Sequence, residues 1–410
     1  MAVTLDDIKS ARRRIAGVIN QTPVIADARL SRETGAGVHL KAESLQKSGS
    51  FKIRGAYNKI SQLADDEKSR GVIAASAGNH AQGVALAARY VGIAATIVLP
   101  EFAPLTKVNA TRGYGAEVIL KGATFDEAVA YSKELQKENG LTYVHAYDDE
   151  RIIAGQGTIG MEIVESLPDV TTIIVPIGGG GVMSGIAIAA KSLKPSVRII
   201  GVQSAAVSWV KPSLVEGRAV IPATKPTIAD GIAVKTPGEL TLPIIREYVD
   251  EIVEVDDEEI AEAIFHSVQN NRLVVEGAGA AGLAAVLSGK IAIAPGESIC
   301  VVLAGGNIDA NLLTRVLEHV LVRHGRYVMF SVLVVDRPGN LAGLLDAVAA
   351  AGANVIEVFH RRAMWLAPLG HVGIEMLLEV RDNDHALAIH SHLKAAGYHI
   401  TREGHGDWEN

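Results

Sequence analysis

Short runs rich in Val and Ile alternate with Ala-rich helical segments along this chain as far as about Val322. Clear examples of the apolar runs are residues 71–75, 172–177 and 298–303. Strands that alternate with helices predict right-handed βαβ units and parallel sheets covered by helices. The 410 residues are 48% hydrophobic but only 4% aromatic, which suits two or three α/β domains with cores of Ala, Val, Ile and Leu.

One lysine stands in an unusual setting, at an apparent strand-to-helix junction. Lys52 follows Phe51 and is surrounded by the small residues of Ser48 to Ala56. A lysine that forms a Schiff base must be neutral part of the time, and desolvation beside an aromatic ring lowers its pKa. Most lysines are instead solvated surface charges. We expect three neighbours to be of that ordinary kind: Lys41, Lys47 and Lys59.

A small polar loop follows the apolar run 71–75 and leads into a helical pattern from Val84 to Val91. The loop reads Ser76-Ala77-Gly78-Asn79-His80-Ala81-Gln82-Gly83. Backbone N–H groups at such a helix N-terminus favour an anion, here a substrate carboxylate. Asn79 is placed to hydrogen-bond an oxygen of a cofactor. From this loop alone, a helix cap made by Ser76 or Asn79 is the alternative.

Four consecutive glycines, Gly178 to Gly181, lie between an apolar strand and an apolar helix. Backbone without side chains can wrap a phosphate there, and a closely packed turn is the alternative. No Gly-Lys-Ser/Thr follows, which excludes a Walker A loop, and the next strand ends at Gln203, where a dinucleotide site needs an acid. The literal G-x-G-x-x-G at Gly277 to Gly282 lacks that acid too, so we interpret it as unrelated to dinucleotides.

A reactive lysine, an anion-binding loop and a glycine cradle for phosphate together indicate pyridoxal phosphate acting on an amino acid. The sequence resembles the threonine dehydratases (threonine ammonia-lyases), a family of fold-type II, tryptophan-synthase-β-like enzymes. Six phrases between Ser48 and Asp309 carry the resemblance: SGSFKIRGA, SAGNHAQG, AGQGTIGMEI, PIGGGG, TIADGIAV and LAGGNID.

The resemblance implies a role for the residues of these phrases. Lys52 would be the catalytic Schiff-base lysine, Phe51 a wall beside the pyridine ring, and Asn79 the partner of the ring hydroxyl. The cofactor phosphate would be held by the glycine loop and the residue after it: Gly178, Gly179, Gly180, Gly181 and Val182. The substrate carboxylate would be bound, together with Asn79, by Ser76, Ala77, Gly78 and His80.

The reaction implied by the resemblance is β-elimination from L-threonine. Lys52 removes the Cα proton, the β-hydroxyl leaves, and hydrolysis yields 2-oxobutanoate and ammonia. L-serine would give pyruvate as a side activity, because one methyl group provides only about 1–3 kcal/mol of discrimination. The alternatives that share the fold are a serine or hydroxy-amino-acid dehydratase or racemase and a β-replacement synthase. A nicotinamide oxidoreductase and a non-catalytic amino-acid sensor are alternatives from other classes.

Three positions depart from the family pattern. Ala304 stands where the family usually has a Ser or Thr facing the pyridine nitrogen. Ala77 stands where the serine-racemase branch has a second catalytic serine, and without a proton donor there we expect no efficient racemisation. The segment Gln203 to Trp209 has no carboxylate where that branch binds a divalent cation, so we predict no metal.

The family fold implies a large catalytic domain from residues 1–45 and 150–322 and a small one from residues 46–149, with pyridoxal phosphate in the cleft. After the charged hinge 323–326, strands and helices follow in the order βαββαβ, which predicts an α+β domain.

The turn from Asp336 to Leu341 in this last domain resembles that of ACT regulatory domains, over residues 327–405. The family binds amino-acid effectors at paired ACT domains, so the resemblance makes Asn340 and Leu341 contacts for an effector, with isoleucine or valine expected. A purely structural dimerisation module is the alternative, because an exposed edge strand associates readily.

Charge and cysteine content limit partners and compartment. The net charge of -7 argues against a nucleic-acid surface. Cys300 is the only cysteine and lies in an apolar run, so we expect a buried, inert thiol and a reducing cytoplasm. Leu5 to Ile19 reads as a polar amphipathic helix rather than a signal peptide, and no run is long enough for a membrane span. We expect a cytoplasmic homo-dimer or homo-tetramer.

Overall fold

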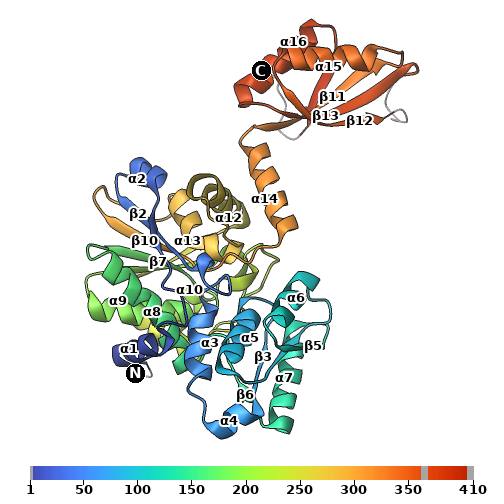
Figure 1. Cartoon of the computed structure of the whole chain (residues 1–410). Helices are drawn as coiled ribbons and strands as arrows, with labels where there is room; N and C mark the ends of the chain where they lie inside the picture. Colours follow the sequence, from blue (N-terminus) through green and yellow to red (C-terminus); the bar gives the residue numbers. More distant parts are fainter. Residues whose placement is uncertain (1–2, 362–367, 404–410) are drawn as a thin grey trace. The chain divides into compact units, whose positions relative to one another are not determined.

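The computed structural model describes residues 3–361 and 368–403 (Figure 1). Strands and helices alternate up to residue 309, as the sequence pattern predicts. No helix in the described ranges is long and apolar enough to cross a membrane.

A six-stranded sheet forms the larger framework of this part, in the order β1-β2-β10-β7-β8-β9. Its strands are β1 (Val24–Ala26), β2 (Gly37–Ala42), β7 (Thr172–Pro176), β8 (Arg198–Ser204), β9 (Glu251–Val255) and β10 (Ser298–Leu303). All neighbours are parallel except β1 and β2. The central strands are almost entirely buried, as expected for a parallel sheet covered on both faces.

Helices cover both faces of this sheet. Val175 of β7 packs with Ile186 of α9 (Gly181–Leu193), while its neighbour Ile174 faces Gly282 of α13 (Gly277–Leu287). Successive strand residues point to opposite faces, so the two helices lie on opposite sides. Figure 1 shows α8 and α9 on one side and α12 and α13 on the other. Cys300 of β10 is buried, as predicted, and burial raises the pKa of its thiol to about 12.

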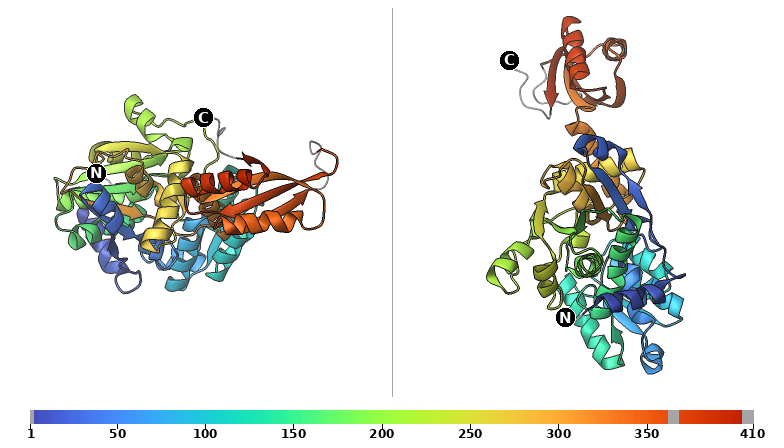
Figure 2. Two further views of the ribbon diagram at one scale, coloured as in Figure 1. Left: turned by 90° about the horizontal axis from the view of Figure 1, so that it is seen from above. Right: turned by 90° about the vertical axis from the view of Figure 1, so that its left-hand side faces the viewer.

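A smaller, fully parallel sheet has the order β5-β4-β3-β6. It consists of β3 (Val72–Ala75), β4 (Ala95–Leu99), β5 (Glu117–Leu120) and β6 (Thr142–Tyr143). Its helices are α3 (Lys52–Ile60), α4 (Asp65–Arg70), α5 (Asn79–Val91), α6 (Leu105–Gly113) and α7 (Phe125–Asn139). These blue and cyan elements stay together in every view of Figures 1 and 2.

Further helical segments connect or cover the two sheets. They are α1 (Leu5–Ile15), α2 (Ala28–Thr34), α8 (Glu150–Ser166), α10 (Val210–Glu216), α11 (Thr241–Tyr248) and α12 (Asp257–His266), with the shorter turns η1 (Glu43–Leu45), η2 (Ala205–Val207), η3 (Asp230–Ile232) and η4 (Ser267–Asn271). The helix expected from Leu5 to Ile19 therefore ends four residues early, where Ala16 leaves the helical conformation.

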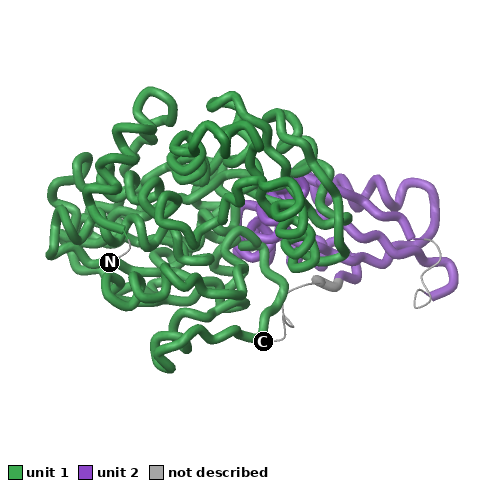
Figure 3. Tube along the Cα trace, turned by 90° about the horizontal axis from the view of Figure 1, so that it is seen from below, with its two compact units in different colours: residues 1–309 green, residues 310–410 purple. Residues whose placement is uncertain are grey.

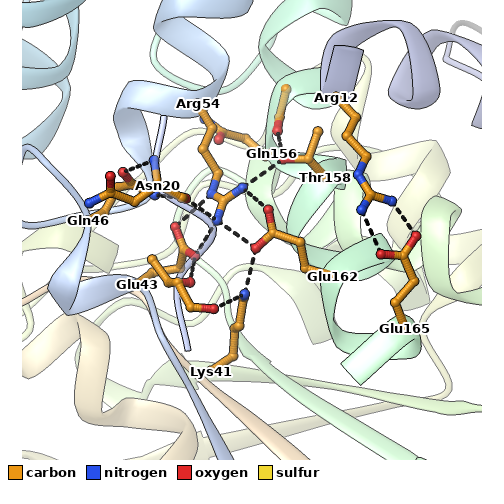
Figure 4. A network of polar contacts seen from close by, with 12 residues as sticks. Arg12, Asn20, Lys41, Glu43, Gln46, Arg54, Gln156, Thr158, Glu162 and Glu165 are labelled. Atoms are coloured by element: carbon orange, nitrogen blue, oxygen red, sulfur yellow. Dashed lines mark hydrogen bonds and ion pairs between the residues drawn. The ribbon is translucent and has the colours of Figure 1, made fainter. Parts of the chain in front are cut away.

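A buried network of charges joins α3 to β2 and α8 (Figure 4). Arg54 of α3 donates to Glu43 (2.8 Å) and to Glu162 of α8 (2.7 Å), and Lys41 of β2 donates to Glu162 at 2.5 Å. Arg54 and Lys41 are 0% exposed. Burial alone would lower the pKa of Arg54 and raise that of Glu43, but their mutual attraction prevails and moves both pKa values the other way. Two cations therefore balance two anions.

The network overturns one sequence prediction. Lys41 is not a solvated surface charge, because its Nζ lies inside this cluster. Lys59 is also buried and donates to Asp149 (2.7 Å) and to the carbonyl of Tyr143 (2.8 Å). Lys47 is exposed, as expected. Pattern alone could not separate them, because the acidic partners of the two buried lysines are 90 residues or more away in sequence.

The chain divides into two compact units, Met1–Asp309 and Ala310–Asn410, coloured separately in Figure 3. The second unit begins with α14 (Ala310–Arg323), which belongs to it rather than to the part before it.

The rest of the second unit confirms the predicted βαββαβ arrangement. Its elements are β11 (Tyr327–Val335), α15 (Asn340–Ala350), β12 (Asn354–Arg361), β13 (His371–Glu379), α16 (Asn383–Ala395) and β14 (His399–Glu403). The sheet is antiparallel, in the order β12-β13-β11-β14. Alternate side chains of β11, such as Phe330, are buried against both helices. Residues 404 and 405 of the expected domain lie outside the described residues.

Candidate active site

Lys52 opens helix α3, but the preceding strand is less direct than predicted. Strand β2 ends at Ala42, and the chain passes through η1 and a loop before α3 begins. Ser50 then pairs with Gly305 in an isolated antiparallel bridge, and the N–H of Phe51 donates to the carbonyl of Ala304 (3.2 Å). The loop that carries the lysine is therefore fixed to the end of β10.

The amine of Lys52 lies in an enclosed, weakly polar position. Its Nζ donates to the carbonyl of Ala146 (2.9 Å) and lies 5.1 Å from the ring centroid of Phe51. Burial lowers the pKa of Lys52 to about 8, although the negative charge of Glu276 acts in the opposite direction. An appreciable fraction of this amine is therefore neutral near physiological pH, which an ordinary lysine is not.

The polar loop after β3 leads directly into α5, whose N-terminus is not capped by a side chain. The cap residue is Gly78, and Ser76 Oγ accepts from its N–H (3.2 Å) to form a local turn. Asn79 is the first helical residue and makes no cap bond either. The first N–H groups of this 13-residue helix thus remain available for an anion.

Within this loop, His80 and Ala77 differ in what they can offer a ligand. The side chain of His80 is buried, and its Nε2 lies 2.8 Å from the carbonyl of Val144. Burial and the nearby Lys52 lower the pKa of His80 to about 3, so the imidazole is neutral and donates Nε2–H to that carbonyl. Only its backbone is left for a carboxylate. Ala77 is partly exposed and carries no polar side chain.

The side chain of Asn79 lies between two partners from distant parts of the sequence. Its Oδ1 accepts from Asn307 Nδ2 (2.7 Å), and its Nδ2 donates to Glu276 Oε1 at 2.6 Å. Sequence reasoning gave no role to Glu276, which directly precedes the G-x-G-x-x-G interpreted above as unrelated to dinucleotides. The available signal was an isolated acid between an apolar run and a glycine-rich helix start. Asn307 belongs to the phrase LAGGNID, and its contact with Asn79 was likewise not predicted.

The glycine loop connects β7 to α9 and runs close against Tyr147. A Cβ on Gly179 would lie 2.3 Å from Cδ1 of that ring, and one on Gly181 would lie 2.8 Å from the Tyr147 carbonyl. Gly180 has a φ of +92°, which residues with a side chain rarely adopt. The loop therefore requires glycine for its backbone path, and the contact with Tyr147 was not foreseen.

The carbonyls of this loop are already hydrogen-bonded, so its N–H groups are the polar groups left at the start of α9. Trp209 Nε1 donates to the carbonyl of Gly178 (3.0 Å), and Thr241 Oγ1 donates to that of Gly179 (2.8 Å). The side chain of Val182 packs into the core, which leaves only its backbone for a ligand. A helix N-terminus with free N–H groups favours an anion such as phosphate.

The residues brought together here suit pyridoxal phosphate. An amine with a lowered pKa, an uncapped helix start and a side-chain-free loop at a second helix start lie in one unit. Ser184 Oγ, in the first turn of α9, is buried and has no hydrogen-bond partner among the described residues, so this end of the site keeps unused polar capacity.

The remaining departures lie where the sequence suggested. Ala304 follows β10 and is 4% exposed. Gln203 lies inside β8 rather than after it, and its Oε1 accepts from the N–H of Val210 (2.9 Å). Within residues 3–361 and 368–403, no three His, Cys, Asp or Glu residues are grouped as metal ligands.

Comparison with known proteins agrees with this geometry. A family model of pyridoxal-phosphate dependent enzymes matches residues 15–305. An L-threonine ammonia-lyase of Thermotoga maritima is 50% identical over 398 residues, which cover 97% of this chain and 99% of that protein.

Solved structures resemble the same region. The threonine deaminase of the organism abbreviated T.th. has a TM-score of 0.70 and 39% identity, covering 75% of this chain and 99% of its own. Maize serine racemase has a TM-score of 0.73 and 38% identity, covering 79% of this chain and 100% of its own.

Proposed function

Because this chain belongs to the family of pyridoxal-phosphate dependent enzymes, we propose that it is an L-threonine ammonia-lyase that uses Lys52 as its catalytic residue. The reaction would convert L-threonine to 2-oxobutanoate and ammonia, with L-serine giving pyruvate as a side reaction. The observation that carries the proposal is the Lys52 amine, enclosed at the start of α3 with its pKa lowered to about 8. The similarity to an L-threonine ammonia-lyase along nearly the whole chain supports the choice of substrate.

Several groups of this chain would hold the cofactor. The backbone of Gly178–Val182 would bind its phosphate, Asn79 its ring hydroxyl, and Phe51 would lie beside its ring. Pyridoxal phosphate, when bound, supplies a sink for the negative charge that develops at Cα. Residues 46–149, as a small domain, and residues 1–45 and 150–322, as a large domain, would enclose it.

The protein's own contribution to the reaction is to bind the substrate and move protons. The uncapped start of α5, with Ser76 to His80, would bind the substrate carboxylate through backbone N–H groups. Lys52 Nζ would take the proton from Cα, because a partly neutral amine can accept it near neutral pH. The neutral His80 adds no second positive charge that would lower the basicity of Lys52 further.

Racemisation is the second candidate activity, because maize serine racemase is structurally similar. A racemase needs a group that returns a proton to the opposite face of Cα. Ala77 has no such group, whereas the racemase branch is expected to have a serine there. We therefore propose elimination as the dominant outcome, with little D-amino acid formed.

The test is an absorption spectrum of the purified protein and of Lys52→Ala, followed by addition of L-threonine and an assay for 2-oxo acids. The proposal expects a visible cofactor band that is altered in the variant, and 2-oxobutanoate from the wild type alone. Lys47→Ala, on the exposed loop before α3, is the matched control and should behave as wild type. A wild type that stays colourless and inert with added pyridoxal phosphate would contradict the proposal and favour an amino-acid sensor.

For the second unit we propose a regulatory role. A cavity of about 360 Å³ lies beside the turn after β11, lined by Val334, Val335, Asp336, Arg337, Pro338, Gly339, Leu341, His360 and Val372. Asp336 and Arg337 offer charges opposite to the ammonium and carboxylate of an amino acid, and apolar walls suit isoleucine or valine. Asn340 does not line the cavity, because its Nδ2 donates to the carbonyl of Val335 (2.8 Å) and so holds the turn.

The expected homo-dimer or homo-tetramer, in the cytoplasm, remains part of this proposal. Strand β12 is an edge of the sheet, and its apolar residues Ile356 and Phe359 are 39% and 40% exposed. Such an edge is suited to pairing with a second copy. Sedimentation with and without isoleucine, on the wild type and on Leu341→Asp, tests both ideas. An effector site predicts that isoleucine changes threonine saturation in the wild type and has no effect on the variant.

A further inference from the structure

One buried carboxylate belongs to the proposed active site but has no part in the mechanism above. Glu276 precedes α13 and is 7% exposed. Its side chain does not cap its own helix. Instead the carboxylate lies over Gly305, where an added Cβ would come within 2.3 Å of Oε1. Gly305 directly follows Ala304, the position at which this chain lacks the hydroxyl expected to face the pyridine nitrogen.

Glu276 fixes which hydrogen-bonding group of Asn79 remains free. One N–H of the Asn79 amide is donated to Glu276, and its Oδ1 accepts from Asn307. Asn307 is held in turn by donating to the carbonyl of Ser48 (2.8 Å). A rotated Asn79 amide would lose both of its bonds, so its second N–H is the donor left for a ligand.

We propose that Glu276 is a positioning residue, which holds Asn79 as a hydrogen-bond donor toward the cofactor ring and couples the ionisation of that ring to its own charge. The inference rests on the proposed function, because it needs bound pyridoxal phosphate. An N–H donor favours an ionised ring oxygen over a protonated one. A negative carboxylate on the other side of the same amide partly offsets that preference, and a neutral carboxyl does not.

The charged groups around Glu276 allow this switch to operate near neutral pH. Burial, followed by the charge of Asp230, raises the pKa of Glu276 to about 7, while the bond from Asn79 and the charges of Lys107 and Lys52 act in the opposite direction. Asp230 belongs to η3 and Lys107 to α6, and the two form an ion pair at 2.5 Å. Removal of Asp230 would free Lys107 as well, so both changes would lower the pKa of Glu276.

The experiment is a pH titration of the holoenzyme absorption spectrum from mildly acidic to mildly alkaline pH, in the absence of substrate. We expect the cofactor band of the wild type to change with a midpoint within about one pH unit of the Glu276 pKa of about 7. Glu276→Gln should lose this transition, and Asp230→Asn should move its midpoint to lower pH. Glu33→Gln, an exposed glutamate of α2, is the matched control and should keep the wild-type midpoint.

The outcomes separate this inference from the proposed function. A wild type with no cofactor band would overturn both. A wild type that binds cofactor and forms 2-oxobutanoate, but whose transition is absent or is unchanged in Glu276→Gln, would overturn the role of Glu276 alone. If Glu276→Gln fails to fold, the Asp230→Asn midpoint decides, because a purely structural Glu276 would leave that midpoint in place.

Discussion

Two groups of buried charges lie at α3, and they differ in how completely they are neutralised. In the first, Arg54 and Lys41 meet Glu43 and Glu162, and the pairs move the pKa values of Arg54 and Glu43 further from neutral pH. In the second, Lys52 and Glu276 interact with each other only at a distance, and burial moves the pKa of each toward neutral pH.

The difference separates a structural cluster from a chemical one. Fully paired charges hold α3 against β2 and α8 and cannot exchange protons near neutral pH. Incompletely paired charges beside the start of the same helix can do so, which is what proton transfer requires. We infer that the paired cluster keeps the N-terminal turn of α3 in place so that Lys52 can remain incompletely paired.

The largest effect should come from removing the central cation of the paired cluster. Arg54→Met leaves Glu43 and Glu162 with Lys41 alone, and an uncompensated buried charge costs about 3–5 kcal/mol of unfolding free energy. Urea denaturation of the apoprotein measures this. If Arg54→Met is as stable as the wild type, the cluster does not hold α3 in the way described.

A smaller and pH-dependent effect is expected at Glu276. Its ordinary pKa in the unfolded chain lies below the value of about 7 in the folded protein. Stability contributed by the neutral carboxyl is therefore complete below about pH 4.5 and is lost as the pH rises to about 7.

The variant Glu276→Gln should escape this loss. Relative to wild type, its unfolding free energy should rise across that window by about 1–3 kcal/mol and then stay constant. Urea midpoints of the two apoproteins, measured at several pH values on either side of neutrality, provide the measurement. A difference that is the same at every pH would show that Glu276 does not titrate there.

A partly buried pair on the same helix should lie between the extremes. Lys59 and Asp149 are 11% and 22% exposed at their side chains, and Asp149 also caps α8. Lys59→Met should cost about 1–2 kcal/mol by urea denaturation, because two hydrogen bonds from a charged donor are lost. A cost as large as that of Arg54→Met would mean that burial does not grade these pairs.

The smallest effect is expected at the surface pair shown beside the buried cluster in Figure 4. Arg12 and Glu165 form a two-pronged pair, but their side chains are 36% and 45% exposed. Arg12→Met should change the unfolding free energy by about 0–1 kcal/mol. It serves as the matched control for Arg54→Met, and a loss of several kcal/mol would remove the distinction between buried and exposed pairs.

The sequence predicted the fold class, the element order and the motifs of the site, because these depend on local patterns. Hydrophobic periodicity gave β10 at residues 298–303 and the βαββαβ order of the second unit. It could not find the partners of Lys41 or Asn79, because Glu162 and Glu276 are 121 and 197 residues away. Arg54 and Glu162 both belong to phrases used for the family resemblance, yet their role in packing α3 is visible only in three dimensions.

The central claim, that Lys52 is the lysine bonded to pyridoxal phosphate, can be tested by borohydride reduction of the holoenzyme. Reduction fixes the cofactor to its lysine, and mass spectrometry of the digested protein then identifies that residue. The account predicts that the modified peptide carries the cofactor on Lys52, with Lys41 and Lys59 unmodified because both are buried in ion pairs. Cofactor fixed to another lysine, or to none, would contradict it.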